Sequence, residues 1–313
     1  MEALLNINEL SLDARINNKN YNIVNDVSVK VKKGEIVSIV GESGSGKTLT
    51  FLSTIRLLEK NLFIKKGEII FENKNILNLD EKEIRKIRGK EISYIFQEPL
   101  TALNPVIDIE TQISEVLIQH KICNEKQARE KVKEMLLKVG ISPEKSKQYP
   151  HNFSGGQRQR ILIAMALISN PKLIIADEPT TALDVITQIE ILNLLKEIKE
   201  EKKAIVLITH NISVVANYSD YVYVMYLGQI MENGKTYDVI NNPIHPYTRL
   251  LLNSIITLDK KERLKPIEGY TPSIYEIPEG CRFITRCPYK LEKCKIQPPI
   301  RKKGERYFRC WNV

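Results

Sequence analysis

Long apolar runs are missing from this chain of 313 residues. The longest one, Ile161–Ile168, is far shorter than the roughly 18 residues that a membrane-spanning helix needs. The segment Met1–Leu4 has neither the basic residues nor the apolar stretch with which a secretory signal begins. From these two absences we expect a soluble, cytoplasmic chain.

A biased composition is missing as well. The proportions of 42% hydrophobic and 27% charged residues exclude a disordered chain, and 14 glycines are too few for a collagen-like one. Cysteine is too scarce for a disulfide scaffold, since the whole chain has five. The length allows two domains at about 150 residues per domain.

An excess of positive charge is lacking outside the tail. The net charge is +9, but residues 281–313 hold ten Lys or Arg and two Glu, a local balance of +8, which leaves +1 for the first 280 residues. A protein that binds duplex nucleic acid spreads basic residues over a face or a helix. We therefore predict no nucleic-acid partner and expect a local anionic group near the tail.

What the chain does contain is an α/β pattern. Residues 35–40, EIVSIV, are a continuous apolar run typical of a buried strand, and apolar residues at helical spacing predict a helix over 47–59. Helical patterns continue over 98–153, and Asp184 is the expected N-cap of a helix over 184–199. A further helix is expected over 247–256. The other predicted strands cover 27–31, 67–71, 91–96, 172–176, 204–208 and 221–226.

The glycine-rich loop Gly41–Thr48 matches G-x-x-x-x-G-K-[ST] between a predicted strand and a predicted helix, which is the context this motif requires. Its backbone N–H groups can turn toward phosphate oxygens, while Lys47 neutralises the β- and γ-phosphates and the Thr48 hydroxyl binds Mg²⁺. We predict that ATP is bound here by Gly41, Ser43, Gly44, Ser45, Gly46, Lys47 and Thr48.

Two adjacent carboxylates follow the apolar residues 173–176. The carboxyl end of a buried strand is where α/β sheets place their ligands. We predict that Asp177 binds Mg²⁺ and that Glu178 orients and deprotonates the attacking water.

With these motifs in place, the chain resembles the ATP-binding-cassette (ABC) ATPases. FSGGQRQR at residues 153–160 matches the family's signature motif, and Gln97, residues 182–184 (Ala-Leu-Asp) and His210 match its Q-loop, D-loop and switch histidine in the family's order. The resemblance implies a P-loop ABC ATPase cassette of the α/β class, with a RecA-like core, a mostly parallel sheet and a helical subdomain. The implied parts are a core over 1–97 and 159–235, a helical signature subdomain over 98–158, and a C-terminal extension over 236–313.

The resemblance also implies a role for each matched residue. Gln97 would contact Mg²⁺ and the attacking water, and His210 would contact the γ-phosphate and position Glu178. The signature motif would close on ATP bound by a second ABC ATPase subunit, so that ATP is enclosed between two chains. The residues of this contact are Ser154, Gly155, Gly156, Gln157 and Asp184. An aromatic residue upstream of the phosphate loop is expected to stack on adenine, and Tyr21 is the candidate.

Two further segments narrow the resemblance. QEPLTALNP (97–105) and NPIHPYTRLLLNSI (242–255) look like the ATPase subunits of oligopeptide/dipeptide importers, a branch that includes nickel importers. This implies an ATP-hydrolysing subunit on the cytoplasmic face of the cell membrane that drives the import of di- or oligopeptides, with nickel or another small solute as the alternative. The implied partners are a second ATPase, identical or related, two transmembrane permease subunits and an extracytoplasmic solute-binding protein.

A soluble ABC ATPase of DNA repair or translation is the alternative from another class. Repair-type members insert long coiled coils, but only 105 residues separate Thr48 from Ser154 here, without a sustained heptad pattern. Translation-type members carry two cassettes, whereas this chain has a single phosphate loop. Both features favour the importer.

The tail holds four of the five cysteines, Cys281, Cys287, Cys294 and Cys310. Their gaps of five, six and fifteen residues differ from the paired C-x₂-C spacing of zinc ribbons, and structural disulfides are disfavoured in a reducing cytoplasm. Four thiolates suit Zn²⁺ or a [4Fe–4S] cluster, and the local charge of +8 would offset either anionic site. Some members of the resembled branch carry a [4Fe–4S] cluster on this pattern, so we predict the cluster, with Zn²⁺ or four free thiols as the alternatives.

Overall fold

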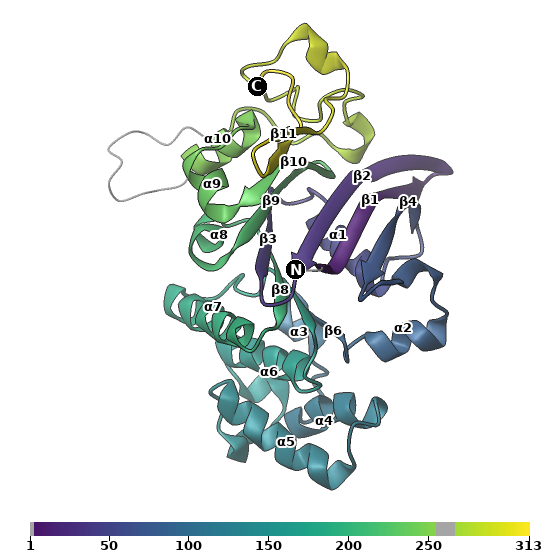
Figure 1. The fold of residues 1–313 in the computed structure, drawn as a ribbon. Helices are drawn as coiled ribbons and strands as arrows, with labels where there is room; N and C mark the ends of the chain where they lie inside the picture. Colours follow the sequence, from purple (N-terminus) through teal and green to yellow (C-terminus); the bar gives the residue numbers. More distant parts are fainter. Residues whose placement is uncertain (1–2, 255–266) are drawn as a thin grey trace. The chain divides into compact units, whose positions relative to one another are not determined.

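The structure is a computed structural model and describes residues 3–254 and 267–313. The chain forms two compact units, one from Met1–Asn78 together with Ile208–Val313 and the other from Leu79–Leu207. Figure 1 shows their elements in chain order. Within the described residues, no helix combines the length and the apolar character needed to span a bilayer. The division at 97, 158 and 235 proposed from the motifs is a functional one and stays a prediction.

The first unit begins with an antiparallel sheet of order β2-β1-β4-β5. The two long strands form a hairpin whose turn, Asn17 and Asn18, has φ values of 48° and 60°, as the tight two-residue turns between twisted strands require. The strand bounds are β1 Ala3–Ile16, β2 Lys19–Lys32, β4 Leu62–Phe71 and β5 Lys74–Asn75.

A second set of strands in this unit carries the phosphate loop. The fully buried β3, Ile36–Val40, pairs in parallel with β9, Tyr221–Tyr226. Antiparallel strands continue the sheet beyond β9 in the order β10, β12 and β11. β10 directly follows β9 in the chain, and β11 and β12 come from the C-terminal extension. The remaining bounds in this unit are β10 Gln229–Lys235, β11 Arg301–Lys303, β12 Arg306–Phe308, α1 Lys47–Leu52, α8 Ile212–Tyr218, α9 Thr236–Asn241 and α10 Pro246–Asn253.

The helix expected over 47–59 is shorter than predicted. It ends at Leu52 and continues as a 3₁₀ turn over Ser53–Ile55, after which Arg56 has a positive φ of 53°. The hydroxyl groups of Ser53 and Thr54 each donate to a backbone carbonyl three residues earlier, at 2.6 Å. Such local bonds compete with helix continuation. The helix expected over 247–256 is α10, and residues 255 and 256 lie outside the described residues.

The second unit contains β6 Ile92–Ile95 and β7 Leu173–Asp177, paired in parallel, with β8 Ala204–Thr209 next to β7 in the order β8-β7-β6. β7 and β8 are buried at every residue, which explains their continuous apolar sequence. The segment 98–153 is helical, as predicted, and α4 packs against α5 and α6 (Figure 1). The helices are α2 Glu81–Ile87, α3 Pro99–Ala102, α4 Ile109–Gln119, α5 Glu125–Lys138, α6 Gly155–Leu167 and α7 Val185–Glu200.

Candidate functional site

The loop between β3 and α1 curls around the amine of its own lysine. Lys47 Nζ donates to the carbonyl oxygens of Gly41 (2.8 Å) and Glu42 (2.9 Å) and to Ser45 Oγ (3.3 Å). The tip of the loop, Ser43 and Gly44, is exposed, whereas Lys47 is 5% exposed. This is a closed backbone ring with a buried cation at its centre, which suits a phosphate group.

Two glycines of this loop cannot be replaced without moving the backbone. A Cβ atom on Gly41 would lie 2.0 Å from the carbonyl oxygen of Met225. Gly46 has a φ of 92°, a conformation that side chains rarely allow, and it forms the N-cap of α1. The close approach of β9 and the sharp turn into α1 therefore both require glycine.

Two other predicted site residues lie in the same unit. The ring of Tyr21, on β2, contacts Tyr275 edge-on with centroids 5.0 Å apart. His210 is exposed and directly follows β8. The adenine-stacking role of Tyr21 and the phosphate role of His210 stay predictions.

In the second unit, Asp177 is the last residue of β7 and is 3% exposed. The Tyr94 hydroxyl, on the neighbouring β6, donates to Asp177 Oδ2 at 2.7 Å. Burial, together with the charge of Asp177, raises the pKa of Tyr94, so the phenol stays protonated and remains a donor. A buried strand-end carboxylate of fixed orientation has the oxygen chemistry that Mg²⁺ prefers.

Glu178 and Gln97, two predicted site residues, lie within hydrogen-bond distance of each other. Gln97 Nε2 donates to Glu178 Oε2 at 3.1 Å, and the Thr181 hydroxyl donates to the same oxygen at 2.9 Å. Glu178 itself has a φ of 46°, in the left-handed region, which turns the chain sharply at the end of β7. A backbone strained in this way at a candidate catalytic carboxylate favours a functional role.

The signature motif forms the start of α6. Ser154 Oγ accepts from the Gln157 N–H at 3.3 Å, and Gln157 Oε1 accepts from the Ser154 N–H at 3.1 Å, a reciprocal capping box. Gly155 and Gly156 form the first turn of the helix. Ser154 and Gly155 are exposed, so this turn can meet a partner.

The D-loop residue Asp184 caps α7, as predicted, by accepting from the Thr187 N–H at 3.0 Å and from its hydroxyl at 2.7 Å. These two bonds hold the pKa of Asp184 below its usual range. Thr187 also lies against the signature turn, because a Cβ on Gly156 would meet Thr187 Cγ2 at 2.5 Å. Signature and D-loop are therefore one packed surface of the second unit.

Tyr94 and Thr181 were missed from sequence. Tyr94 appears only as one aromatic residue in the strand EISYIF, and its place beside Asp177 depends on the register of β6 against β7. Thr181 follows Glu178 by three residues, a spacing that could have indicated a local hydrogen bond to the carboxylate.

The four tail cysteines lie in the first unit. Cys281, Cys294 and Cys310 are buried, and Cys287 is partly buried. The backbone of Cys281 donates to the Cys294 carbonyl at 2.8 Å, and peptide N–H groups donate to the sulfur atoms of Cys294 (3.5 Å) and Cys310 (3.4 Å). Burial, with a contribution from the other three thiols, raises the pKa of Cys281 to about 12. Over residues 3–254 and 267–313, however, no three His, Cys, Asp or Glu side chains are arranged to hold a metal ion.

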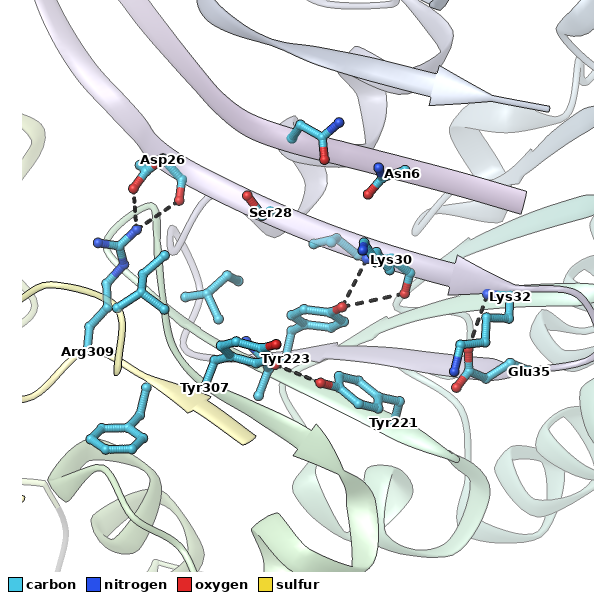
Figure 2. A pocket seen from close by; sticks show the side chains of 16 residues that line it. Asn6, Asp26, Ser28, Lys30, Lys32, Glu35, Tyr221, Tyr223, Tyr307 and Arg309 are labelled. Atoms are coloured by element: carbon cyan, nitrogen blue, oxygen red, sulfur yellow. Dashed lines mark hydrogen bonds and ion pairs between the residues drawn. The ribbon is translucent and has the colours of Figure 1, made fainter. Parts of the chain in front are cut away.

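A cavity of about 360 Å³ also lies in the first unit (Figure 2). Its lining includes Lys30 on β2, Tyr221 and Tyr223 on β9, and Tyr307 on β12. Tyr223 accepts the Lys30 N–H at 2.9 Å. Glu35, which lines the cavity, lies just before the first residue of β3. The phosphate loop follows the last residue of the same strand, so the cavity and the nucleotide loop are separate.

The chain is similar to known transport ATPases along nearly its whole length. Residues 24–181 match the family model "ABC transporter", and residues 231–294 match "Oligopeptide/dipeptide transporter, C-terminal region". The oligopeptide transport ATP-binding protein AppD of Bacillus subtilis is 44% identical, with 99% of this chain and 97% of that protein covered. OppD of Escherichia coli, also an oligopeptide transport ATP-binding protein, is 45% identical over 96% of this chain and 90% of its own length.

Solved structures show the same architecture. The ATP-binding cassette MJ0796, in a dimer bound to ADP and Pi, superposes with a TM-score of 0.67 at 29% identity, covering 74% of this chain and 98% of that one. CbiO1 from Clostridium perfringens, part of an ABC transporter complex, gives a TM-score of 0.67 at 29% identity, covering 77% and 92%. The predicted α/β ATPase cassette fold is confirmed.

Proposed function

This chain belongs to the ATP-binding subunits of ABC transporters, in the branch of the oligopeptide and dipeptide importers, and we propose that it hydrolyses ATP to drive the import of di- or oligopeptides. The observation that supports the proposal is the match to an oligopeptide transport ATP-binding protein along nearly the whole chain, together with the match of residues 231–294 to the oligopeptide/dipeptide transporter C-terminal region. As in an importer, the chain would work with two permease subunits, a second ATPase and an extracytoplasmic solute-binding protein, at the cytoplasmic face of the membrane.

The phosphate loop and the residues that follow β6, β7 and β8 each have a part in the proposed reaction. The residues Gly41–Thr48 bind the triphosphate, with Lys47 neutralising its charge. The Thr48 hydroxyl and the buried Asp177 carboxylate are the oxygen donors that would hold Mg²⁺, and the ion when bound would help to neutralise phosphate charge. Glu178 accepts the proton of the attacking water, and Gln97, which donates to its carboxylate, keeps that oxygen in place. His210 contacts the γ-phosphate.

Ser154, Gly155 and Gly156 complete the site of a second cassette. Their support is the exposed turn at the start of α6, where N–H groups and the helix dipole attract anions. ATP binding would close two cassettes on each other through this turn and the Asp184 loop, and hydrolysis would reopen them. The cycle of closing and opening drives the permease subunits.

We also infer that the four tail cysteines hold a [4Fe–4S] cluster. Four cysteine thiolates are the usual ligands of such a cluster. The support is that three of the four cysteines are buried and that the other three thiols contribute to the raised pKa of Cys281, so the four lie near one another. The N–H groups that donate to Cys294 and Cys310 are typical support for thiolates.

The cluster is tested on the full chain purified without oxygen. We expect a brown protein with equal amounts of iron and sulfide, bleached by dithionite. Cys287→Ser should lose this absorption, and Cys123→Ser, outside the tail, should keep it. A colourless protein with stoichiometric zinc would contradict the cluster.

The transport function is tested in cells that lack the chromosomal copy of this gene. Wild-type chain should restore uptake of a labelled tripeptide, and Lys47→Ala should not, while Lys60→Ala, an exposed lysine of the same unit, serves as the control. Restoration of nickel uptake but not of peptide uptake would assign the chain to the nickel importers instead.

A further inference from the structure

One residue of the phosphate loop is held by the C-terminal extension. Glu42 is the only carboxylate within Gly41–Thr48. Its Oε2 accepts from Arg286 Nη1 at 2.6 Å and from the Thr271 hydroxyl at 2.6 Å, and its backbone N–H donates to the Tyr247 hydroxyl at 3.1 Å. Three residues from beyond residue 235 thus converge on a single position of the loop.

The guanidinium of Arg286 is buried and is held in position by several hydrogen bonds. Its side chain is 6% exposed, compared with 26% for Glu42. Besides the carboxylate, it donates to the Thr271 hydroxyl (3.2 Å) and to the carbonyl oxygens of Ile267 (3.3 Å) and Glu268 (3.2 Å). It also lies over the ring of Tyr226, 5.8 Å from the centroid. Because these contacts already hold the side chain, Arg286 loses little conformational entropy when it binds the Glu42 carboxylate.

The position of Glu42 affects the lysine of the loop. The Glu42 carbonyl accepts from Lys47 Nζ at 2.9 Å, so residue 42 and the phosphate-binding cation share one hydrogen-bond network. A carboxylate in an anion-binding loop repels a triphosphate unless a cation neutralises it. Arg286 supplies that cation and also fixes the direction in which the carboxylate points.

The packing around Arg286 joins it to the cysteine tail. The core cluster that contains Val40, immediately before the phosphate loop, also contains Tyr226, Tyr247, Phe283 and Cys281. Arg286 itself directly precedes Cys287. The tail and the phosphate loop are therefore neighbours in one core.

We propose that Arg286 is a positioning residue for ATP: by neutralising and orienting Glu42, the C-terminal extension sets the affinity of the phosphate loop for nucleotide. This inference rests on the proposed ATP site at Gly41–Thr48. It gives the extension a part in nucleotide binding in addition to any role in the cluster.

The test is a double-mutant cycle on the full chain, with the dissociation constant of the non-hydrolysable analogue AMP-PNP as the measurement. Arg286→Gln should weaken binding about tenfold or more, because the Glu42 charge is then unpaired. Glu42→Gln should bind at least as tightly as the wild type. The double variant should return to within about threefold of Glu42→Gln, a recovery that a merely structural role for Arg286 would not produce.

Two further variants serve as a control and as a substitute for Arg286→Gln. Arg301→Gln is the matched control, because Arg301 lies in the same extension but donates to the Val313 carbonyl at 2.7 Å. Thr271→Val removes one donor to the Glu42 carboxylate with little change of shape, and should weaken binding by a smaller factor that Glu42→Gln cancels. This variant replaces Arg286→Gln if the latter does not fold.

Binding of AMP-PNP by these variants separates an error in the ATP site from an error in the role of Arg286. If Lys47→Ala binds the analogue as the wild type does, the ATP site itself is wrong. If Lys47→Ala abolishes binding but neither Arg286→Gln nor Thr271→Val weakens it, or the double variant binds as weakly as Arg286→Gln, the role of Arg286 is overturned while the site stands.

Discussion

Gln97 donates a hydrogen bond to the carboxylate of Glu178 across 3.1 Å, although 81 residues separate them in the sequence. The Thr181 hydroxyl donates to the same Oε2 atom. Two donors on one oxygen fix the direction of the carboxylate that we propose accepts a proton from water. The arrangement is that of a general base with a fixed orientation.

Glu178→Gln tests this role. The substitution keeps the size of the side chain but cannot accept the proton, so ATP hydrolysis should fall by about a hundredfold or more, while binding of ATP is retained. Phosphate release and ATP binding are measured on the same preparation. Glu197→Gln, an exposed glutamate of α7, is the control and should hydrolyse ATP as the wild type does. Undiminished hydrolysis by Glu178→Gln would rule out Glu178 as the base.

Tyr94 orients Asp177, the proposed Mg²⁺ ligand. Tyr94→Phe removes the hydroxyl that donates to Oδ2 and leaves the ring in place. Groups that hold a metal ligand in orientation typically change metal affinity by ten- to a hundredfold, so the Mg²⁺ concentration for half-maximal hydrolysis should rise about tenfold. Tyr149→Phe, on an exposed ring of the same unit, should leave it unchanged. An unaltered Mg²⁺ requirement in Tyr94→Phe would show that this bond has no part in metal binding.

The contact between signature and D-loop predicts a suppressor. Gly156→Ala places a Cβ 2.5 Å from Thr187 Cγ2, and this overlap should lower the free energy of unfolding by about 1–3 kcal/mol. Adding Thr187→Ser removes the methyl group but keeps the hydroxyl that donates to Asp184. Urea denaturation should therefore show recovery in the double variant. If the second substitution restores nothing, the two segments do not pack as described.

His245 makes stability depend on pH. It is 1% exposed, its Nδ1 accepts the Tyr247 N–H at 3.0 Å, and burial lowers its pKa to about 3. Its pKa in the unfolded chain is about 6.5, so between these values the unfolded chain binds a proton that the folded chain does not. The free energy of unfolding should therefore fall as the pH drops below 6.5, by up to about 1.4 kcal/mol per pH unit from this residue.

Urea denaturation between pH 7.5 and 5.5 measures this slope. His245→Asn keeps an acceptor at the N-cap of α10 but does not titrate, so its stability should fall less steeply with acidification than that of the wild type. The exposed His151, changed to Asn, is the control. Equal slopes in His245→Asn and the wild type would contradict the assignment.

Features that depend on neighbouring residues could be predicted from sequence. The strand before the phosphate loop is a continuous apolar run, and the caps at Ser154 and Asp184 need only residues three positions apart. Gln97 and Glu178 could be paired only through the order of the family's motifs, because nothing local joins them.

Features set by tertiary packing could not be predicted. β1 is one of the two longest strands, but a register shift between Ile7 and Leu10 interrupts its alternation, and it was not expected. The contact of Tyr94 with Asp177 depends on strand register, and that of Arg286 with Glu42 joins residues 244 positions apart. Long-range charge pairs of this kind leave no periodic trace in a sequence.

The proposed transport cycle requires that ATP is enclosed between two cassettes. Its direct test is the mass, by light scattering, of the Glu178→Gln chain with its companion ATPase subunit, identical or related, at saturating Mg·ATP. We expect a two-cassette particle that retains ATP, and we expect that adding Ser154→Arg on the exposed signature turn dissociates it. Single cassettes at saturating ATP, or a pair that Ser154→Arg leaves intact, would contradict it.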